Sequence, residues 1–132
     1  MPLIQRKQRL FSACVLWAVL LVALAMQPEK LVETFLPFSI MRSLAHSAAY
    51  GAFAFLLCLY FSFRRHWLGV PMKGLAMHAA AFLLTAALGG LTEIIQLFSP
   101  DRYAELADWF FDLGGAAGGI MVFVYFRRWG IL

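Results

Sequence analysis

The residues that could do chemistry are concentrated between Glu93 and Gly119, where carboxylates, an amide and an arginine interrupt an otherwise apolar chain. Carboxylates can accept or donate protons, an arginine can bind phosphate or carboxylate, and an amide can bind sugar or peptide groups. Polar side chains are costly at membrane depth, where they face a packed interior or a wet cavity and mark functional sites. This stretch therefore predicts the site, and the rest of the chain must position it.

The composition places this site in a membrane protein. The chain has 132 residues, 63% hydrophobic and 14% charged, with a mean hydropathy of +0.78. Soluble domains are roughly half apolar and about a quarter charged. The basic residues form short clusters between apolar runs, which argues against a nucleic acid partner despite the net charge of +4. We expect the lipid bilayer as the surroundings and no separate soluble module.

Four apolar segments, each long enough to cross a bilayer, predict an all-α integral membrane bundle. We expect one domain over residues 1–132 with helices at residues 10–26, 43–63, 75–98 and 106–126. Basic residues before the first segment, and Ala23 and Ala25 in an A-x-A pattern, also fit a signal peptide. We interpret this segment as an uncleaved helix because its apolar run is longer than that of a signal peptide. Residues 27–42 predict a loop with a short interfacial helical turn.

The distribution of charge predicts the orientation, because Lys and Arg concentrate in cytoplasmic segments. One side of the predicted bundle carries basic residues and no acid, namely Arg6, Lys7, Arg9, Arg64, Arg65, Lys73, Arg127 and Arg128. All seven acids fall on the other side, with Lys30, Arg42 and Arg102. We therefore expect cytoplasmic N- and C-termini and an outward-facing loop at residues 99–105.

Three predicted helices each place polar or small residues on one face, at steps of three or four residues. These faces are Arg42, His46 and Tyr50 on the second helix; Thr85, Gly89, Thr92 and Gln96, with Glu93 beside them, on the third; and Asp108, Asp112, Gly115 and Gly119 on the fourth. At 1.5 Å of rise per residue, Glu93 and Asp112 lie about 10 Å below the outer ends of their helices. The faces therefore predict one shallow, outward-facing polar layer.

The glycines of these helices predict close packing. Gly115 and Gly119 have the GxxxG spacing, as do Gly114 and Gly118, and Gly89 lies on the third helix. Small residues allow helix backbones to approach closely in lipid. We assign them to helix packing and not to ligand binding.

We expect no cofactor and no metal. One histidine with scattered carboxylates, such as His46 with Glu93 and Asp108, is weak support for a zinc site. Cys14 and Cys58 fall in different apolar segments without a metal-binding motif, so we interpret both as packing residues.

Two interpretations of the polar layer remain open at this stage. Its three carboxylates, with Arg102, Arg42 and protonated His46 as the available cations, can form a buried network that only locks the bundle. The same groups can instead engage or transform a ligand, and we favour this second interpretation.

The joint spacing of these residues resembles the VanZ-like family, small membrane proteins associated with teicoplanin resistance. The resemblance rests on His46, Tyr50, Glu93, Gln96, Arg102, Asp108, Asp112, Gly115 and Gly119. Members of the family often have Asn at the position of Asp112 and an Asp-Lys pair where this chain has Arg42 and Ser43. An ion pair between Arg42 and Asp112 would restore neutrality. The resemblance implies a bacterial cytoplasmic (inner) membrane protein linked to envelope biology or glycopeptide antibiotic resistance.

The favoured function is an accessory role in which the layer binds a lipid-linked envelope precursor or a lipidated antibiotic (a lipoglycopeptide). Arg102 and Arg42 would contact phosphate or carboxylate groups, because guanidinium forms paired hydrogen bonds with both. Gln96, Asp108 and Asp112 would contact sugar or amide groups. His46, Tyr50 and Glu93 complete the predicted ligand site.

The alternative is an enzyme acting on the same class of molecule. His46 would transfer protons, Asp108 or Asp112 would orient it, Glu93 would be a second acid-base group and Arg102 would stabilise negative charge. The sequence has no recognised serine or cysteine nucleophile motif and no HExxH motif. A small transporter ranks last, because its essential charges should lie near the midplane and these crowd one side.

Overall fold

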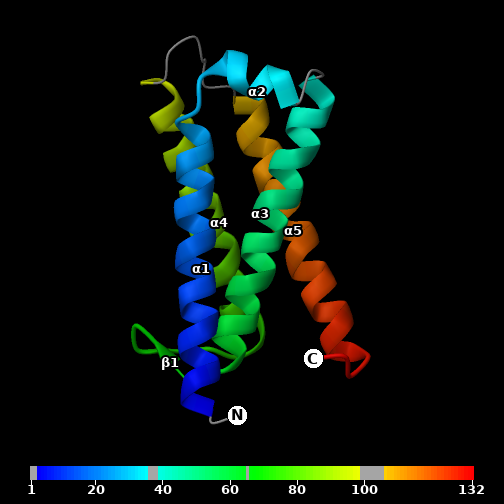
Figure 1. Ribbon diagram of the computed structural model, residues 1–132. Helices are drawn as coiled ribbons and strands as arrows, with labels where there is room; N and C mark the ends of the chain where they lie inside the picture. The colour runs from blue at the N-terminus through cyan, green and yellow to red at the C-terminus, as the bar shows by residue number, and fades with distance from the viewer. Residues whose placement is uncertain (1–2, 36–38, 65, 99–105) are drawn as a thin grey trace.

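The computed structural model describes residues 3–35, 39–64, 66–98 and 106–132. Four long helices form a bundle: α1 (Leu3–Ala25), α3 (Ser39–Ser62), α4 (Gly74–Gln96) and α5 (Leu106–Arg128). The short helix α2 (Glu29–Phe35) lies across one end, and the antiparallel pair β1 (His66–Trp67) and β2 (Val70–Pro71) lies near the other (Figure 1). Helix α1 begins and α5 ends at the β1–β2 end, so the chain starts and finishes on the same side of the bundle.

Each long helix has the length and composition of a membrane span. Within the described residues, the qualifying segments are Ile4–Ala25, Ile40–Ser62, Gly74–Gln96 and Leu106–Arg128. A 23-residue helix is about 34 Å long, enough to cross a hydrocarbon core of about 30 Å. In lipid, helices satisfy all of their own interior backbone hydrogen bonds, which explains why apolar runs of this length fold in this way. The predicted all-α bundle with four spanning helices is confirmed.

The helix ends differ from the predicted boundaries in an informative way. Helix α1 begins at Leu3, not at residue 10, because the basic residues before the apolar run are good helix formers and continue the helix into the polar region. Helix α3 begins at Ser39, not at residue 43, so Arg42 lies within the helix. The helical turn predicted within residues 27–42 is present as α2.

Helix α3 is the centre of the bundle, contacting α1, α4 and most extensively α5. A Cβ atom at Gly115 would lie 2.1 Å from the carbonyl oxygen of Ser47, and one at Gly119 would lie 2.0 Å from that of Gly51. The Ser47 hydroxyl also donates a hydrogen bond of 2.7 Å to the carbonyl oxygen of Phe111. The backbones of α3 and α5 therefore touch at a crossing that leaves no room for a side chain.

The second GxxxG pair of α5 does not take part in this crossing. A Cβ atom at Gly114 or Gly118 would meet nothing within 4 Å. Both lie on α5 but on another face, because one residue along a helix rotates the side-chain position by about 100°. Gly89 of α4 is tightly placed, 3.2 Å from the Asp112 carboxylate and 3.3 Å from the Trp109 ring by the same measure.

The apolar core fills the half of the bundle nearer β1–β2. Phe61, Met77 and Phe123 are fully buried there, and Cys14 and Cys58 are buried free thiols of the same cluster. This agrees with their interpretation as packing residues. Dispersion and close packing hold this half together, and the polar residues are left to the α2 end.

Candidate functional site

The buried face of α4 is the first component of the site. Thr85, Gly89, Thr92 and Gln96 are all buried, as their spacing predicted, and Glu93 beside them is buried as well. Thr92, Glu93 and Gln96 lie in the last turns of α4, at the end of the bundle that α2 crosses. Burial of an acid and an amide in a membrane span requires partners from neighbouring helices.

The second component is a contact between α3 and α5. His46 Nδ1 lies 3.3 Å from Asp112 Oδ1, and the Asp112 side chain is fully buried. One turn nearer the α2 end, the Ser43 hydroxyl donates to Asp108 at 3.4 Å. With Asp112 ionised, the bond places the imidazole proton on Nδ1 and leaves Nε2 as the proton acceptor.

Two further acids act on the same imidazole. The carboxylates of Glu93 and Asp108 lie close enough to influence the charge on His46. The predicted polar layer thus brings together His46, Glu93, Asp108 and Asp112 from three helices. The site therefore groups one imidazole with three carboxyl groups, which are residue types that can transfer protons.

Helices α3 and α4 are joined by a short chain of hydroxyl groups. Tyr50 and Thr92 share a hydrogen bond of 2.5 Å, and Thr92 Oγ1 donates to the Gly89 carbonyl oxygen at 2.8 Å. Because the threonine proton goes to Gly89, the Tyr50 hydroxyl must be the donor to Thr92. Tyr50 is therefore held in place at the floor of the site.

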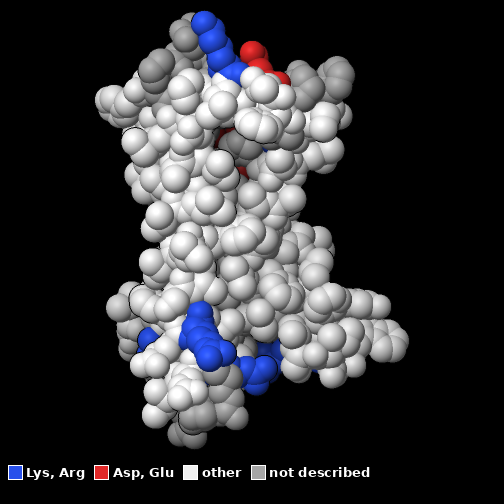
Figure 2. All heavy atoms as spheres, viewed as in Figure 1, with Lys and Arg blue, Asp and Glu red and all other residues white. Residues whose placement is uncertain are grey.

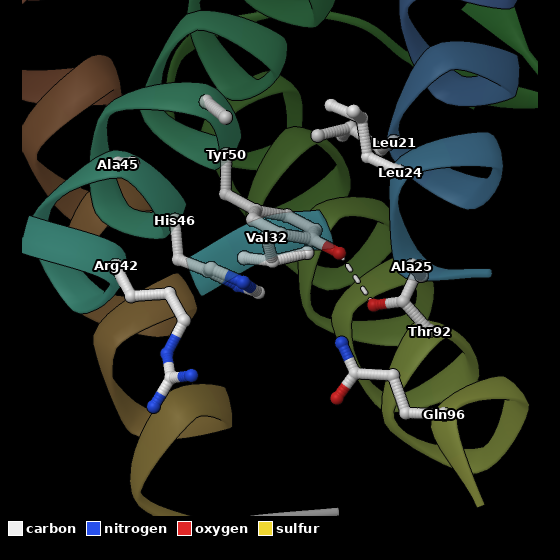
Figure 3. Close-up of a pocket in the computed structure, with 11 residues that line it drawn as sticks. Leu21, Leu24, Ala25, Val32, Arg42, Ala45, His46, Tyr50, Thr92 and Gln96 are labelled. Carbon is white, nitrogen blue, oxygen red and sulfur yellow. Dashed lines mark hydrogen bonds between the residues drawn. The ribbon is translucent and has the colours of Figure 1, made fainter. Parts of the chain in front are cut away.

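A cavity of about 140 Å³ lies next to these groups. Its polar side chains are Arg42, His46, Tyr50, Thr92 and Gln96. In Figure 3, His46 and Tyr50 from α3 point toward Thr92 and Gln96 from α4. Gln96 is 2% exposed, and its Nε2 makes no hydrogen bond with the part of the chain that the structure describes. In Figure 3 this nitrogen points toward the side of the cavity that holds Tyr50 and His46. A buried donor of this kind is costly unless a ligand or water satisfies it.

The opposite wall of the cavity is apolar. Helix α1 contributes Leu21, Leu24 and Ala25, and α2 contributes Val32. Helix α1 is fixed against α3 by a hydrogen bond of 2.9 Å from Trp17 Nε1 to the Ala49 carbonyl oxygen. Figure 2 shows a hollow below α2 at this height, with acidic atoms visible inside it. The cavity surface is therefore mainly apolar, with polar side chains only on its α3 and α4 side, and the cavity opens on the side of the bundle.

The structure places most of the predicted site residues in one region. Arg102 lies outside the described residues. The contact between His46 and Asp112 is one of the two that the alternative interpretation expected for this imidazole. Arg42 lines the cavity, and its ion pair with Asp112 stays a prediction.

Sequence reasoning missed the apolar wall. Leu21, Leu24 and Ala25 look like any other lipid-facing residues of a span, so no sequence signal marks them. Val32 lies in the short apolar stretch between two acids, and this amphipathic pattern was the available hint. In the described ranges, no three His, Cys, Asp or Glu side chains are grouped closely enough to hold a metal.

A comparison with known protein families gives a match that covers the whole of this site. The sequence model of the VanZ/LLP1 family matches residues 10–127, which include every residue of the cavity and Asp112. No curated protein and no solved structure matches the chain.

Proposed function

This chain belongs to the VanZ/LLP1 family, as its resemblance predicted, and we propose that it binds the head group of an amphiphilic cell-envelope molecule in the α2-end cavity. The observation that carries the proposal is the cavity itself, with Gln96 and His46 on one wall and the apolar residues of α1 and α2 on the other. An amphiphile has a polar head group and an apolar chain. The head group would contact the polar residues of the cavity, and the start of the chain would contact the apolar residues.

The distribution of charge supports an outward-facing site. Lys and Arg gather at the end of the bundle where α1 begins and α5 ends, and acidic atoms appear only at the α2 end on the face shown in Figure 2. By the positive-inside rule, the α2 end faces away from the cytoplasm. The cavity then opens toward the outer leaflet of a bacterial cytoplasmic membrane.

The polar wall favours a head group that carries both an anion and hydrogen-bonding groups. The Arg42 guanidinium and the Gln96 amide N–H can donate to phosphate or carboxylate oxygens, and His46 can add a charged donor when protonated. Sugar or peptide groups would find acceptors in the acids behind His46. Lipid-linked envelope precursors and lipidated glycopeptide antibiotics both have this chemistry, which fits an accessory role in envelope biology or glycopeptide tolerance.

The test is binding of two probes, undecaprenyl phosphate and teicoplanin, to the full chain, with native mass spectrometry or a fluorescence titration as readout. Gln96→Leu should weaken binding roughly tenfold, the usual effect of losing a hydrogen bond to a charged group. Gln27→Leu is the matched control, because Gln27 bonds the Ala23 carbonyl outside the cavity. Equal binding by wild type, Gln96→Leu and Gln27→Leu would overturn the proposal.

The Gln96→Leu variant also distinguishes a ligand-binding site from a network that only stabilises the bundle. The buried Gln96 Nε2 has no partner among the described residues, so an apolar side chain at this position removes an unsatisfied donor. Gln96→Leu should therefore have an unchanged or higher Tm while it loses binding. A lower Tm with unchanged binding would favour a network that only locks the bundle.

One observation favours a second candidate, an enzyme acting on the same class of molecule. Asp112 holds His46 by Nδ1, and an imidazole oriented in this way by a buried carboxylate is a good general base. His46→Gln and Asp112→Asn should then stop turnover of a lipid-linked precursor while binding persists. His66→Gln and Glu33→Gln are exposed matched controls. Parallel loss of binding and phenotype in the first two variants would favour the accessory role.

A further inference from the structure

A second groove lies at the opposite end of the bundle, between the start of α1 and the end of α3. It has a volume of about 210 Å³ and is lined by Ile4, Lys7, Gln8, Phe11, Tyr60 and Arg64. The cationic groups come from both sides, and the rings of Phe11 and Tyr60, with centroids 5.8 Å apart, form an apolar floor. None of these residues belongs to the cavity at the α2 end.

Arg64 is held in this groove by a neutral partner. Its Nε donates to the Tyr60 hydroxyl at 2.8 Å, and its Nη2 donates to the same oxygen. Tyr60 itself is buried, so the position of its hydroxyl is fixed by packing. These bonds orient the guanidinium without neutralising its charge, and they occupy only part of its donor set.

Among the described residues, the acids lie at the α2 end of the bundle, away from these charges. Residues 1–28, 34–92 and 113–132 contain no Asp or Glu. Arg6, the next basic residue of α1, stacks on the Phe63 ring at 4.9 Å, again a neutral partner. Figure 2 shows blue atoms and no red ones at this end of the visible face. This distribution of charge suits an anionic ligand.

An apolar groove continues from this one along α1. It has a volume of about 290 Å³ and is lined by Phe11, Ser12, Val15, Leu16 and Val19. Phe11 lines both grooves, so the groove that holds Lys7 and Arg64 continues directly into an apolar surface that runs toward the middle of the span. A ligand that fills both must have an anionic head and a hydrocarbon chain.

We propose that this pair of grooves binds an anionic phospholipid, with its phosphate between Lys7 and Arg64 and an acyl chain along α1. Arginine and lysine at the end of a span lie at head-group depth, where basic pockets between helices recognise anionic lipids. The phosphate bridges α1 and α3 and thereby ties the first helix to the centre of the bundle. This site is independent of the head-group cavity at the α2 end.

The experiment is a lipid titration of the detergent-purified full chain, read by native mass spectrometry. The probes are phosphatidylglycerol, phosphatidylcholine, dihexanoyl phosphatidylglycerol and glycerol phosphate. Phosphatidylglycerol should bind more tightly than phosphatidylcholine, which has the same phosphate but no net charge, and the short-chain analogue should bind more weakly. Removing each basic side chain should cost about fivefold in affinity, so Lys7→Gln with Arg64→Gln should cost roughly thirtyfold.

The matched control makes the same charge change at the same end of the bundle. Lys73→Gln with Arg128→Gln removes two exposed basic residues that line neither groove and should change affinity less than twofold. An equal loss in both double variants would overturn the proposal, because it would indicate a diffuse charge effect. Displacement of phosphatidylglycerol by glycerol phosphate at equal concentration would also overturn it, because the site would then bind phosphate without a chain. If the first double variant fails to fold, Arg64→Gln alone provides the same comparison, because Arg64 is exposed.

Discussion

Gly115→Ala is expected to damage the candidate site by separating the two helices that form it. A Cβ atom there would lie 2.1 Å from the Ser47 carbonyl oxygen, so α3 and α5 must move apart by about 1 Å before the contact is allowed. His46 precedes Ser47, and its contact with Asp112 is already 3.3 Å long. The same movement would take this pair beyond hydrogen-bond distance. Overpacking typically costs about 1–3 kcal/mol, and we expect about 2 kcal/mol.

Gly118→Ala is the matched control, because a Cβ atom there meets nothing within 4 Å and alanine favours the helix by about 1 kcal/mol. Cys14 and Cys58 are buried free thiols, so a thiol-reactive dye reports unfolding during heating. The Tm of Gly115→Ala should be roughly 6 to 10 °C below that of Gly118→Ala. Equal Tm values, or unchanged probe binding by Gly115→Ala, would refute the link between the glycine crossing and the site.

Three further predictions concern the frame around the site. Tyr50→Phe should cost about 1 kcal/mol of stability, read as a lower Tm, because the bond to Thr92 is lost. Trp17→Phe should loosen α1 by removing its bond to the Ala49 carbonyl, and faster thiol labelling of α1 in the folded protein would report it. A reporter enzyme active only in the periplasm, fused after Arg128, should be inactive, because we expect a cytoplasmic C-terminus.

Each of these has an outcome that would contradict it. Tyr125→Phe and Trp129→Phe are controls at exposed aromatic residues. Losses as large as those of Tyr50→Phe and Trp17→Phe would show that the hydrogen bonds are not responsible. An active periplasmic reporter would reverse the orientation and place the cavity in the cytoplasmic leaflet.

The helices were predictable from the sequence because bilayer thickness sets the length of an apolar span. The buried face of α4 was predictable as well, since Thr85, Gly89, Thr92 and Gln96 follow the helical repeat. These features each involve one helix at a time, so local composition and residue spacing are enough to predict them.

The pairing between helices was not predictable in the same way. Spacing does not determine how far each helix rotates about its axis, so it left both Arg42 and His46 as possible partners of Asp112. The contribution of α1 was invisible for another reason. Leu21, Leu24 and Ala25 carry no chemical mark that separates a cavity wall from a lipid-facing surface.

The most direct test of the central claim is to locate a bound amphiphile in the head-group cavity. A polyprenyl phosphate with a diazirine in its first isoprene units would be photolysed with the full chain in lipid nanodiscs, and the adducts mapped by peptide mass spectrometry. We expect adducts concentrated at Leu21–Ala25 of α1 and at Val32 of α2, and largely lost in Gln96→Leu. Adducts spread evenly over the exposed apolar surfaces of the bundle, or unchanged in Gln96→Leu, would contradict the account.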